Sequence, residues 1–130
     1  MKNYGFLPLV TFVTFLAQPC LAQTPLETVN ARMEAHNNHD LKAFLETYSA
    51  DIQVYDYPDM PLGNKGKAHI EKIFAPLFEA KAVKTKIHYQ AEVGDYVVNH
   101  ETVVREGNQT EYVSIYEVKD GLITSVRFIK

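Results

Sequence analysis

The sequence predicts a single α+β domain in which helices pack on one face of a curved antiparallel β-sheet. The chain has 130 residues, of which 46% are hydrophobic and 22% are charged, a balance that suits one domain with one core. Hydrophobic residues recur at helical spacing up to Phe78, whereas hydrophobic and polar residues alternate from Lys84 onward. Helices followed by a run of strands are typical of the α+β class.

Residues 1–22 are predicted to be a secretory signal peptide and not part of the fold. Lys2 provides a positively charged start, residues 6–17 are apolar, and the Cys-Leu-Ala sequence of residues 20–22 offers a cleavage site. An apolar stretch of this length is too short to span a membrane, which takes about 20 residues. We therefore expect a mature domain of residues 23–130, with no membrane span, that is periplasmic or secreted. Attachment of a lipid to the cysteine is the less favoured alternative.

Three helices are expected in the first half of the mature chain. A helix over residues 24–37 begins with Thr-Pro-Leu-Glu, which combines an N-cap, a first-turn proline and the acid of a capping box. Asp40 is the expected N-cap of a second helix over residues 41–49. A third helix includes residues 69–78, and Pro76 is expected to kink or loosen its last part.

One strand is expected before the third helix and four after it. Alternation over residues 52–57 predicts the first strand, which stops at Pro58 before a loop that contains proline and glycine. The four later strands are predicted to form a meander, because hairpin turns separate them at Gly94-Asp95, Gly107-Asn108 and Asp120-Gly121.

The strand register of these hairpins predicts which side chains form the wall of a pocket. A two-residue turn at Gly107-Asn108 sets Glu101 opposite Ser114, and a similar turn at Asp120-Gly121 sets Ser114 opposite Arg127. Glu101 and Arg127 would then lie about 10 Å apart, a gap that an ion pair or a water bridge can close. Such a pair could contact a ligand or simply brace the sheet. The same face carries Asn99, Val103, Tyr112 and Tyr116.

The opposite face of these strands is more uniformly apolar. A homodimer that buries this outer face would explain the pattern, since a large exposed apolar patch is unusual on a monomer. The residues expected on it are Val98, His100, Thr102, Val104, Val113, Ile115, Val126 and Phe128.

Composition and motifs argue against several classes of function. A net charge of −3 without runs of Lys or Arg is unsuited to binding nucleic acid. The sequence has no Ser-His-Asp arrangement, glycine-rich phosphate loop or CxxC pair, so we expect no nucleotide or redox cofactor. His36 and His39 suggest a metal site, but they fall at a helix end and in the following loop, where rigid geometry is not expected. We therefore expect no metal.

Residues 38–56, together with residues 63–74 and 120–123, resemble the nuclear transport factor 2-like superfamily. The branch they resemble most is that of SnoaL-like polyketide cyclases and ketosteroid isomerases, and the likeness extends over residues 23–130. The resemblance implies a cone-shaped curved sheet and three helices that enclose a pocket, often in a dimer formed through the outer face of the sheet. The superfamily includes isomerases, cyclases, dehydratases, epoxide hydrolases and members without catalysis, so the resemblance is less specific for function than for fold.

The resemblance also implies candidate catalytic residues. Asp56 matches the carboxylate that serves as the proton-shuttling base in the isomerase branch, and Tyr116 falls where that branch has a protonated acid as oxyanion donor. Arg32 stands in place of a tyrosine donor, and its guanidinium could stabilise an enolate or pair with Asp56 and lower its basicity. The simpler interpretations are that Asp56 caps a turn and that Tyr116 is a wall residue.

We expect the mature domain to bind a small, largely apolar organic molecule. In one hypothesis it is an enzyme in which Asp56 moves a proton on a carbonyl-bearing or cyclic substrate, and Tyr116, helped by Arg32 or Asn99, stabilises negative charge. The alternatives are a non-catalytic carrier or sensor, and an assembly domain whose sheet recruits a partner chain. The candidate substrate-binding residues are Arg32, Asn99, Glu101, Tyr112, Ser114 and Arg127.

Overall fold

The computed structural model describes residues 2, 5 and 23–130, so the predicted cleavage site and most of the predicted signal peptide lie outside the described residues. Within the described part, no helix has both the length and the apolar character needed to cross a membrane. The helices are α1 (Pro25–Asn37), α2 (Leu41–Glu46) and α3 (Lys67–Glu79). The strands are β1 (Tyr48–Asp56), β2 (Met60–Pro61), β3 (Val83–Val93), β4 (Tyr96–Arg105), β5 (Asn108–Lys119) and β6 (Leu122–Ile129). The predicted α+β class is confirmed.

Both predicted helix caps are present. The Thr24 hydroxyl accepts a hydrogen bond from the Glu27 amide at 3.2 Å, and the Glu27 carboxylate accepts one from the Thr24 amide at 3.0 Å. Asp40 accepts a hydrogen bond from the Ala43 amide at 3.1 Å and so caps α2. These contacts satisfy amide groups that the first turn of a helix leaves without partners.

The second helix is shorter than predicted. The chain becomes extended at Tyr48, which pairs with Ile123 of β6, and the Tyr48 side chain is almost fully buried. Burial in the sheet therefore outweighs the helical spacing of the sequence here. Pro76 lies inside α3, and the helix continues beyond it to Glu79.

The six strands form one curved, unclosed sheet in the order β2-β1-β6-β5-β4-β3. Neighbouring strands are antiparallel except for β1 and β6, which are parallel. The expectation of an antiparallel sheet is wrong at this one pair, because the chain passes through β2, α3 and the strands β3, β4 and β5 before it returns beside β1 as β6. The parallel pair lies in the interior of the sheet and joins the first half of the chain to the last strand.

The turn between β4 and β5 lies one residue earlier than predicted. It is formed by Glu106 and Gly107, which have φ values of 51° and 80°, and it sets Arg105 opposite Asn108. As a result Glu101 lies opposite Tyr112 and not opposite Ser114. The register error is two residues, so the predicted faces of β4 and β5 are unchanged. The other two predicted turns, Gly94-Asp95 and Asp120-Gly121, are confirmed.

A β-bulge changes the face of β6. The pairing of β5 with β6 shifts by one residue between Glu117 and Val118, so that Arg127 lies opposite Ile115 and Phe128 lies opposite Ser114. A one-residue shift sends every later side chain to the other face. The predicted placement of Ser114 opposite Arg127 is therefore wrong, as is the placement of Val126 and Phe128 on the outer face.

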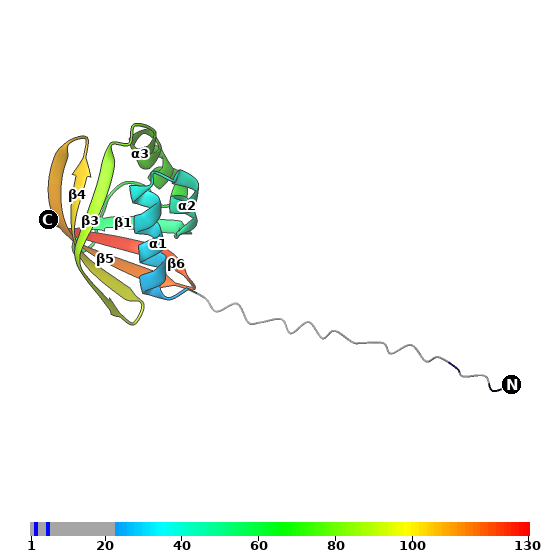
Figure 1. Cartoon of the computed structure of the whole chain (residues 1–130). Helices are drawn as coiled ribbons and strands as arrows, with labels where there is room; N and C mark the ends of the chain where they lie inside the picture. Colours follow the sequence, from blue (N-terminus) through cyan, green and yellow to red (C-terminus); the bar gives the residue numbers. More distant parts are fainter. Residues whose placement is uncertain (1, 3–4, 6–22) are drawn as a thin grey trace.

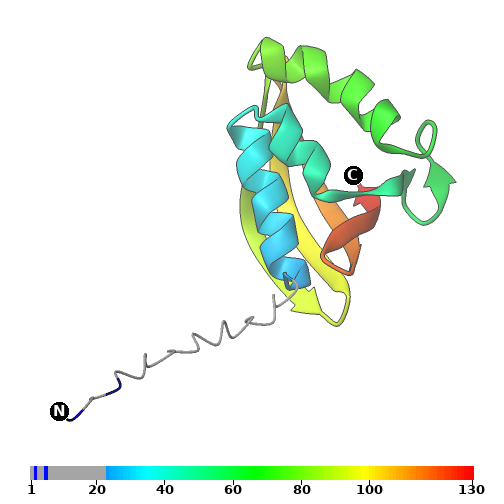
Figure 2. The ribbon, with the colours of Figure 1, turned by 90° about the vertical axis from the view of Figure 1, so that its right-hand side faces the viewer.

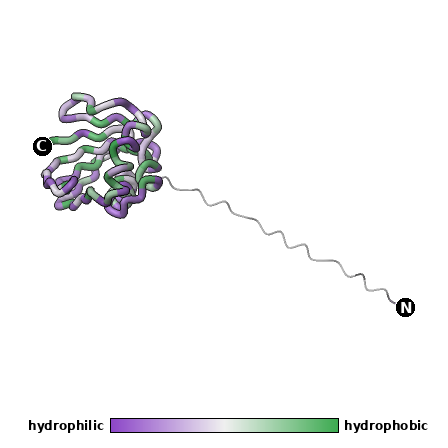
Figure 3. Tube along the Cα trace, turned by 90° about the horizontal axis from the view of Figure 1, so that it is seen from above, coloured by the Kyte–Doolittle hydropathy of each residue, from purple (hydrophilic) through white to green (hydrophobic). Residues whose placement is uncertain are grey.

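The three helices cover one face of the sheet (Figures 1 and 2). The main core lies between these two layers. Along the strands, hydrophobic and hydrophilic stretches alternate, as expected for a sheet whose two faces differ (Figure 3). The side-chain amide of Asn37 fixes the end of α1 to β3, because it donates to the Thr85 carbonyl and accepts from the Thr85 amide, both at 2.8 Å. Core residues include Val29, Met33, Phe44, Tyr48, Leu77, Phe78, Val97, Tyr116 and Ile123.

Candidate functional site

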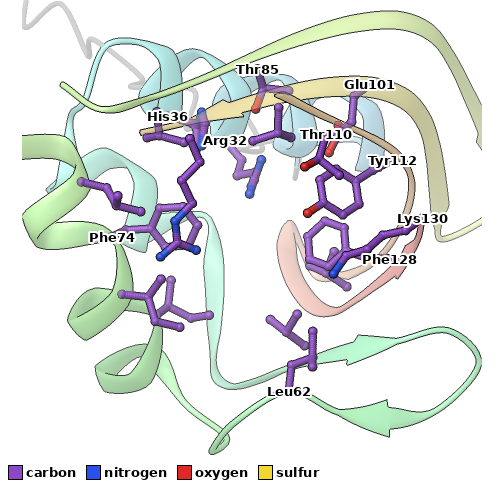
Figure 4. A pocket seen from close by; sticks show the side chains of 18 of the residues that line it. Arg32, His36, Leu62, Phe74, Thr85, Glu101, Thr110, Tyr112, Phe128 and Lys130 are labelled. Carbon is purple, nitrogen blue, oxygen red and sulfur yellow. The ribbon is translucent and has the colours of Figure 1, made fainter. Parts of the chain in front are cut away.

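A pocket of about 420 Å³ lies between the helices and the inner face of the sheet (Figure 4). Its walls are largely apolar, and this size suits a small organic molecule. The apolar lining comes from β1, α3, the loop between them, β3, β4 and β6, and includes Val54, Leu62, Ile70, Ile73, Phe74, Leu77, Val83, Val103, Val126 and Phe128.

Arg32 is a buried cation at the inner end of this pocket. It projects from α1, is 5% exposed, and donates from Nε to the Tyr48 hydroxyl at 2.8 Å. The guanidinium carbon lies 5.1 Å from the centre of the Phe44 ring and 5.4 Å from that of Tyr116. Burial by itself would lower the pKa of Arg32, but electrostatic interactions with Tyr116, Tyr48 and Glu101 raise it overall, so the side chain stays protonated.

His36 lies one helical turn after Arg32 and also lines the pocket. Its ring is surrounded by Phe44, Phe74 and Phe78, with centroid distances of 5.7 to 5.9 Å. Burial, with a smaller effect from the charge of Arg32, lowers the pKa of His36 to about 3. The imidazole is therefore neutral at neutral pH, and it faces the pocket as a polar but uncharged group.

Glu101 is a buried acid in the wall formed by β4. It is 1% exposed and accepts hydrogen bonds from the Ser114 hydroxyl at 2.7 Å and from the Asn99 side-chain amide at 3.2 Å. Asn99 is itself held by the Gln90 amide at 2.9 Å. Asn99 and Ser114 therefore position Glu101 from behind and are not part of the pocket lining.

Asp56, the predicted general base, lines the pocket from the last residue of β1, where it is half-buried. Within the described part of the chain it forms no ion pair with Arg32. Arg32 was expected either to stabilise an enolate or to pair with Asp56 and lower its basicity. The geometry favours the first of these two roles.

Tyr112 lines the pocket as predicted and packs on Phe128, with a centroid distance of 5.4 Å. Three exposed charged residues, Arg105, Glu106 and Lys130, also line the pocket and define its mouth. The Lys130 ammonium lies 5.8 Å from the centre of the Tyr112 ring.

The structure does not bring Tyr116 or Arg127 to the pocket surface. Tyr116 is fully buried behind the wall, and its hydroxyl has no hydrogen-bond partner among the described residues. Burial raises the pKa of Tyr116 strongly. Arg127 is on the outer face, where it pairs with Asp59 at 3.1 Å and covers the Tyr55 ring, so the expected approach to Glu101 is wrong.

Sequence reasoning missed Val126 and Phe128 as wall residues. It considered His36 only as a candidate metal ligand and did not predict the charged mouth. A signal for the first two was present, since Val126 and Phe128 flank the charged Arg127 and this alternation favours the apolar pair inside. Within the described residues, no group of three or more His, Cys, Asp or Glu side chains could hold a metal ion.

Comparison with known proteins places this fold and pocket in a family. The model of the SnoaL-like domain matches residues 29–126. The chain belongs to the SnoaL-like domain family. None of the curated proteins matches it.

Three solved structures illustrate how this SnoaL-like domain compares with others. An NTF2-like protein of unknown function from Cytophaga hutchinsonii is 16% identical, with a TM-score of 0.71 over 85% of this chain and 92% of that one. A proposed polyketide cyclase from Sinorhizobium meliloti is 21% identical, with a TM-score of 0.66 over 78% and 93% of the two chains. A computationally designed 17-OHP binder is 18% identical, with a TM-score of 0.70 over 83% and 94%. At these identities the likeness establishes the fold alone.

Proposed function

We propose that this SnoaL-like domain binds a small, largely apolar organic molecule in its pocket and transfers a proton on it, with Asp56 as general base. The observation that carries the proposal is the presence of the Asp56 carboxylate in the wall of an apolar pocket of about 420 Å³ that has the Arg32 cation at its inner end. A carboxylate in a mainly apolar site is suited to proton transfer at carbon.

The proposed step is the removal of a proton from a carbon next to a carbonyl group. Asp56 takes the proton, the C–H electrons form the carbon–carbon double bond of an enolate, and the carbonyl electrons move onto oxygen. Arg32 donates hydrogen bonds to that oxygen, and Asp56 then returns the proton at the same or another carbon. Donors that are already in place stabilise the developing charge without reorganisation.

The comparisons support this class of ligand without fixing the reaction. Among structures with the same fold, one is a proposed polyketide cyclase and another was designed to bind 17-OHP. Both descriptions apply to those proteins, and we extend only the use of the pocket to this chain.

Binding without catalysis is the second candidate function, and the position of Tyr116 favours it. The predicted oxyanion donor is buried behind the wall, and of the predicted donors Tyr116, Asn99 and Arg32 only Arg32 lines the pocket. In this alternative Asp56 and Glu101 set the polarity of a carrier or sensor.

We further propose that the domain is exported and forms a homodimer through its outer sheet face. Partly exposed apolar residues on this face support the dimer, although Val126 and Phe128 no longer contribute; those that remain are Val98, Val104, Val113 and Ile115. Sedimentation equilibrium of residues 23–130 tests the dimer, and N-terminal sequencing of the exported protein tests cleavage after Ala22.

Exchange of α-protons distinguishes the two candidate functions. In D₂O, the protein is expected to accelerate deuterium incorporation into 2-tetralone, a bicyclic ketone, as followed by NMR. Asp56→Asn should reduce the protein-dependent rate by about 100-fold or more and leave the affinity within about threefold. Asp51→Asn is the matched control, because Asp51 lies on the same strand but is exposed and outside the pocket.

Two results would contradict the catalytic proposal. If Asp56→Asn exchanges 2-tetralone as fast as the unmodified protein, Asp56 is not the base. If the protein binds the ketone but does not accelerate exchange, the non-catalytic function replaces the enzyme.

A further inference from the structure

Two opposite charges lie deep in the pocket without forming an ion pair. Arg32 and Glu101 are 5% and 1% exposed, and both line the same cavity (Figure 4). Ion pairs within the described residues join other side chains, and none joins these two, so their charged atoms are more than 4 Å apart. Buried charges normally occur in direct pairs, because removal from water is costly.

Both groups have hydrogen-bonding capacity left over. Arg32 has five N–H donors, and its recorded partners are the Tyr48 hydroxyl, at Nε, and the Met33 sulfur, at Nη1 and 3.2 Å. The Glu101 carboxylate has about four acceptor positions and receives hydrogen bonds from Ser114 and Asn99. Apart from the Tyr116 hydroxyl, no fully inaccessible side-chain N or O atom in the described chain lacks a partner. The remaining Nη atom of Arg32 is therefore reachable from the pocket.

The charges of the lining residues balance. Apart from the histidines His36 and His69, the basic lining residues are Arg32, Arg105 and Lys130, and the acidic ones are Asp56, Glu101 and Glu106. His36 adds no charge at neutral pH, because burial holds its pKa far below the usual range. A charged ligand would upset this balance in a pocket that is mostly apolar, whereas a neutral dipolar group would not.

We propose that the ligand enters with its polar end first and that this end is an uncharged group with a hydrogen-bond acceptor beside a donor. The acceptor contacts Arg32 and the donor contacts Glu101, which fills the gap between the two charges. A carboxamide, a lactam or an α-hydroxy ketone has this chemistry, whereas a carboxylate or a simple ketone does not. The apolar body of the ligand lies toward the mouth, against Tyr112 and Phe128. This inference rests on the proposed binding function and specifies its ligand class.

Four naphthalene derivatives of similar size test the inference by isothermal titration calorimetry at pH 7.5. They are 2-naphthamide (acceptor and donor), 2-acetonaphthone (acceptor alone), 2-naphthoate (anion) and 2-methylnaphthalene (no polar group). The amide should bind about 10-fold more tightly than the ketone, because the ketone leaves Glu101 without its additional donor, and the anion should bind more weakly than either.

In the Glu101→Gln variant the affinity for 2-naphthoate should increase. A purely structural role of Glu101 would not produce such an increase. Removal of the carboxylate charge leaves Arg32 uncompensated, so 2-naphthoate should bind about 10-fold more tightly to the variant than to the unmodified protein. Glu71→Gln removes the same charge at an exposed position of α3 outside the pocket lining and should change naphthoate affinity by less than about threefold.

Failure of the inference and failure of the proposed function give different results. If all four compounds bind equally well, or if naphthoate gains nothing in Glu101→Gln, head-group recognition is wrong while binding of apolar molecules stands. If even 2-methylnaphthalene does not bind, both proposals are wrong. Tighter binding of naphthoate than of the amide to the unmodified protein would show that the pocket selects anions, which also overturns the inference.

Discussion

The Nε atom of Arg32 donates a hydrogen bond to the Tyr48 hydroxyl at 2.8 Å and thereby joins α1 to the first residue of β1. Both side chains are almost fully buried. A hydrogen bond to a charged group in such a place stabilises a fold more than one between neutral groups. The same contact orients the guanidinium that faces the pocket.

Tyr48→Phe should destabilise the fold by about 1.5–3 kcal/mol, because the buried Arg32 cation loses its acceptor. Urea denaturation monitored by circular dichroism measures this change. Tyr89→Phe is the control, since Tyr89 is 66% exposed and should change the free energy of unfolding by less than about 0.5 kcal/mol. Equal effects of the two substitutions would show that the Arg32 contact contributes little.

The stability of the domain should fall as the pH is lowered below about 6.5. The folded-state pKa of His36 is lowered to about 3 by burial and by Arg32, so between these pH values the unfolded chain binds a proton that the folded chain does not. The free energy of unfolding should therefore decrease toward acid, by at most about 1.4 kcal/mol per pH unit from this residue. Urea denaturation between pH 7.5 and 5 measures the slope.

His36→Phe should reduce that slope, because the variant removes the titrating group and keeps an aromatic ring among Phe44, Phe74 and Phe78. His88→Phe, at an exposed position, is the matched control. A slope that is the same in the His36 variant and the unmodified protein would refute the assignment.

Glu106→Asn should stabilise the domain by about 0.5–1 kcal/mol. Glu106 occupies the first central position of the β4–β5 turn with a φ of 51°, a conformation that asparagine tolerates better than glutamate. The change creates Asn-Gly, the preferred sequence for this turn. A thermal unfolding temperature that stays constant or falls would contradict the turn assignment.

Arg127→Gln should leave ligand affinity within about threefold, since Arg127 is on the outer face and its ionic partner is the exposed Asp59. The loss in stability should be about 1 kcal/mol or less, as for exposed ion pairs. Calorimetric titration with 2-naphthamide, with Arg32→Gln as the comparison, measures this. A large loss of affinity in the Arg127 variant would support the register expected from sequence.

The sequence was sufficient to predict the helix caps, the strand order of the meander and the pocket face of β4 and β5. Thr24, Glu27 and Asp40 act locally, so their roles can be read without tertiary information. The turn at Glu106 was missed by one residue because glutamate is an unusual choice for a positive φ. That error left the faces intact, since it moved the pairing by an even number of residues.

The candidate site was predicted in part. The predicted residues that line the pocket are Asp56, Arg32, Glu101 and Tyr112. Arg127 does not, because the bulge between Glu117 and Val118 turns its side chain to the outer face. The sequence near Glu117 and Val118 contains no residue that predicts a bulge. This bulge needs no glycine, and tertiary packing determines the position of the extra residue. Tyr116 is on the inner face of the sheet, as predicted, but it is buried behind the pocket wall. Alternation along a strand predicts the face of a side chain and not whether other side chains cover it.

The position of β6 between β1 and β5 has a consequence for biosynthesis. Until the ribosome has released residues 122–129, the edges of both neighbouring strands lack their partner and the cavity lacks Val126 and Phe128. The domain therefore cannot complete its sheet before β6 has been made, and loss of this strand would leave two open edges free to associate with other chains.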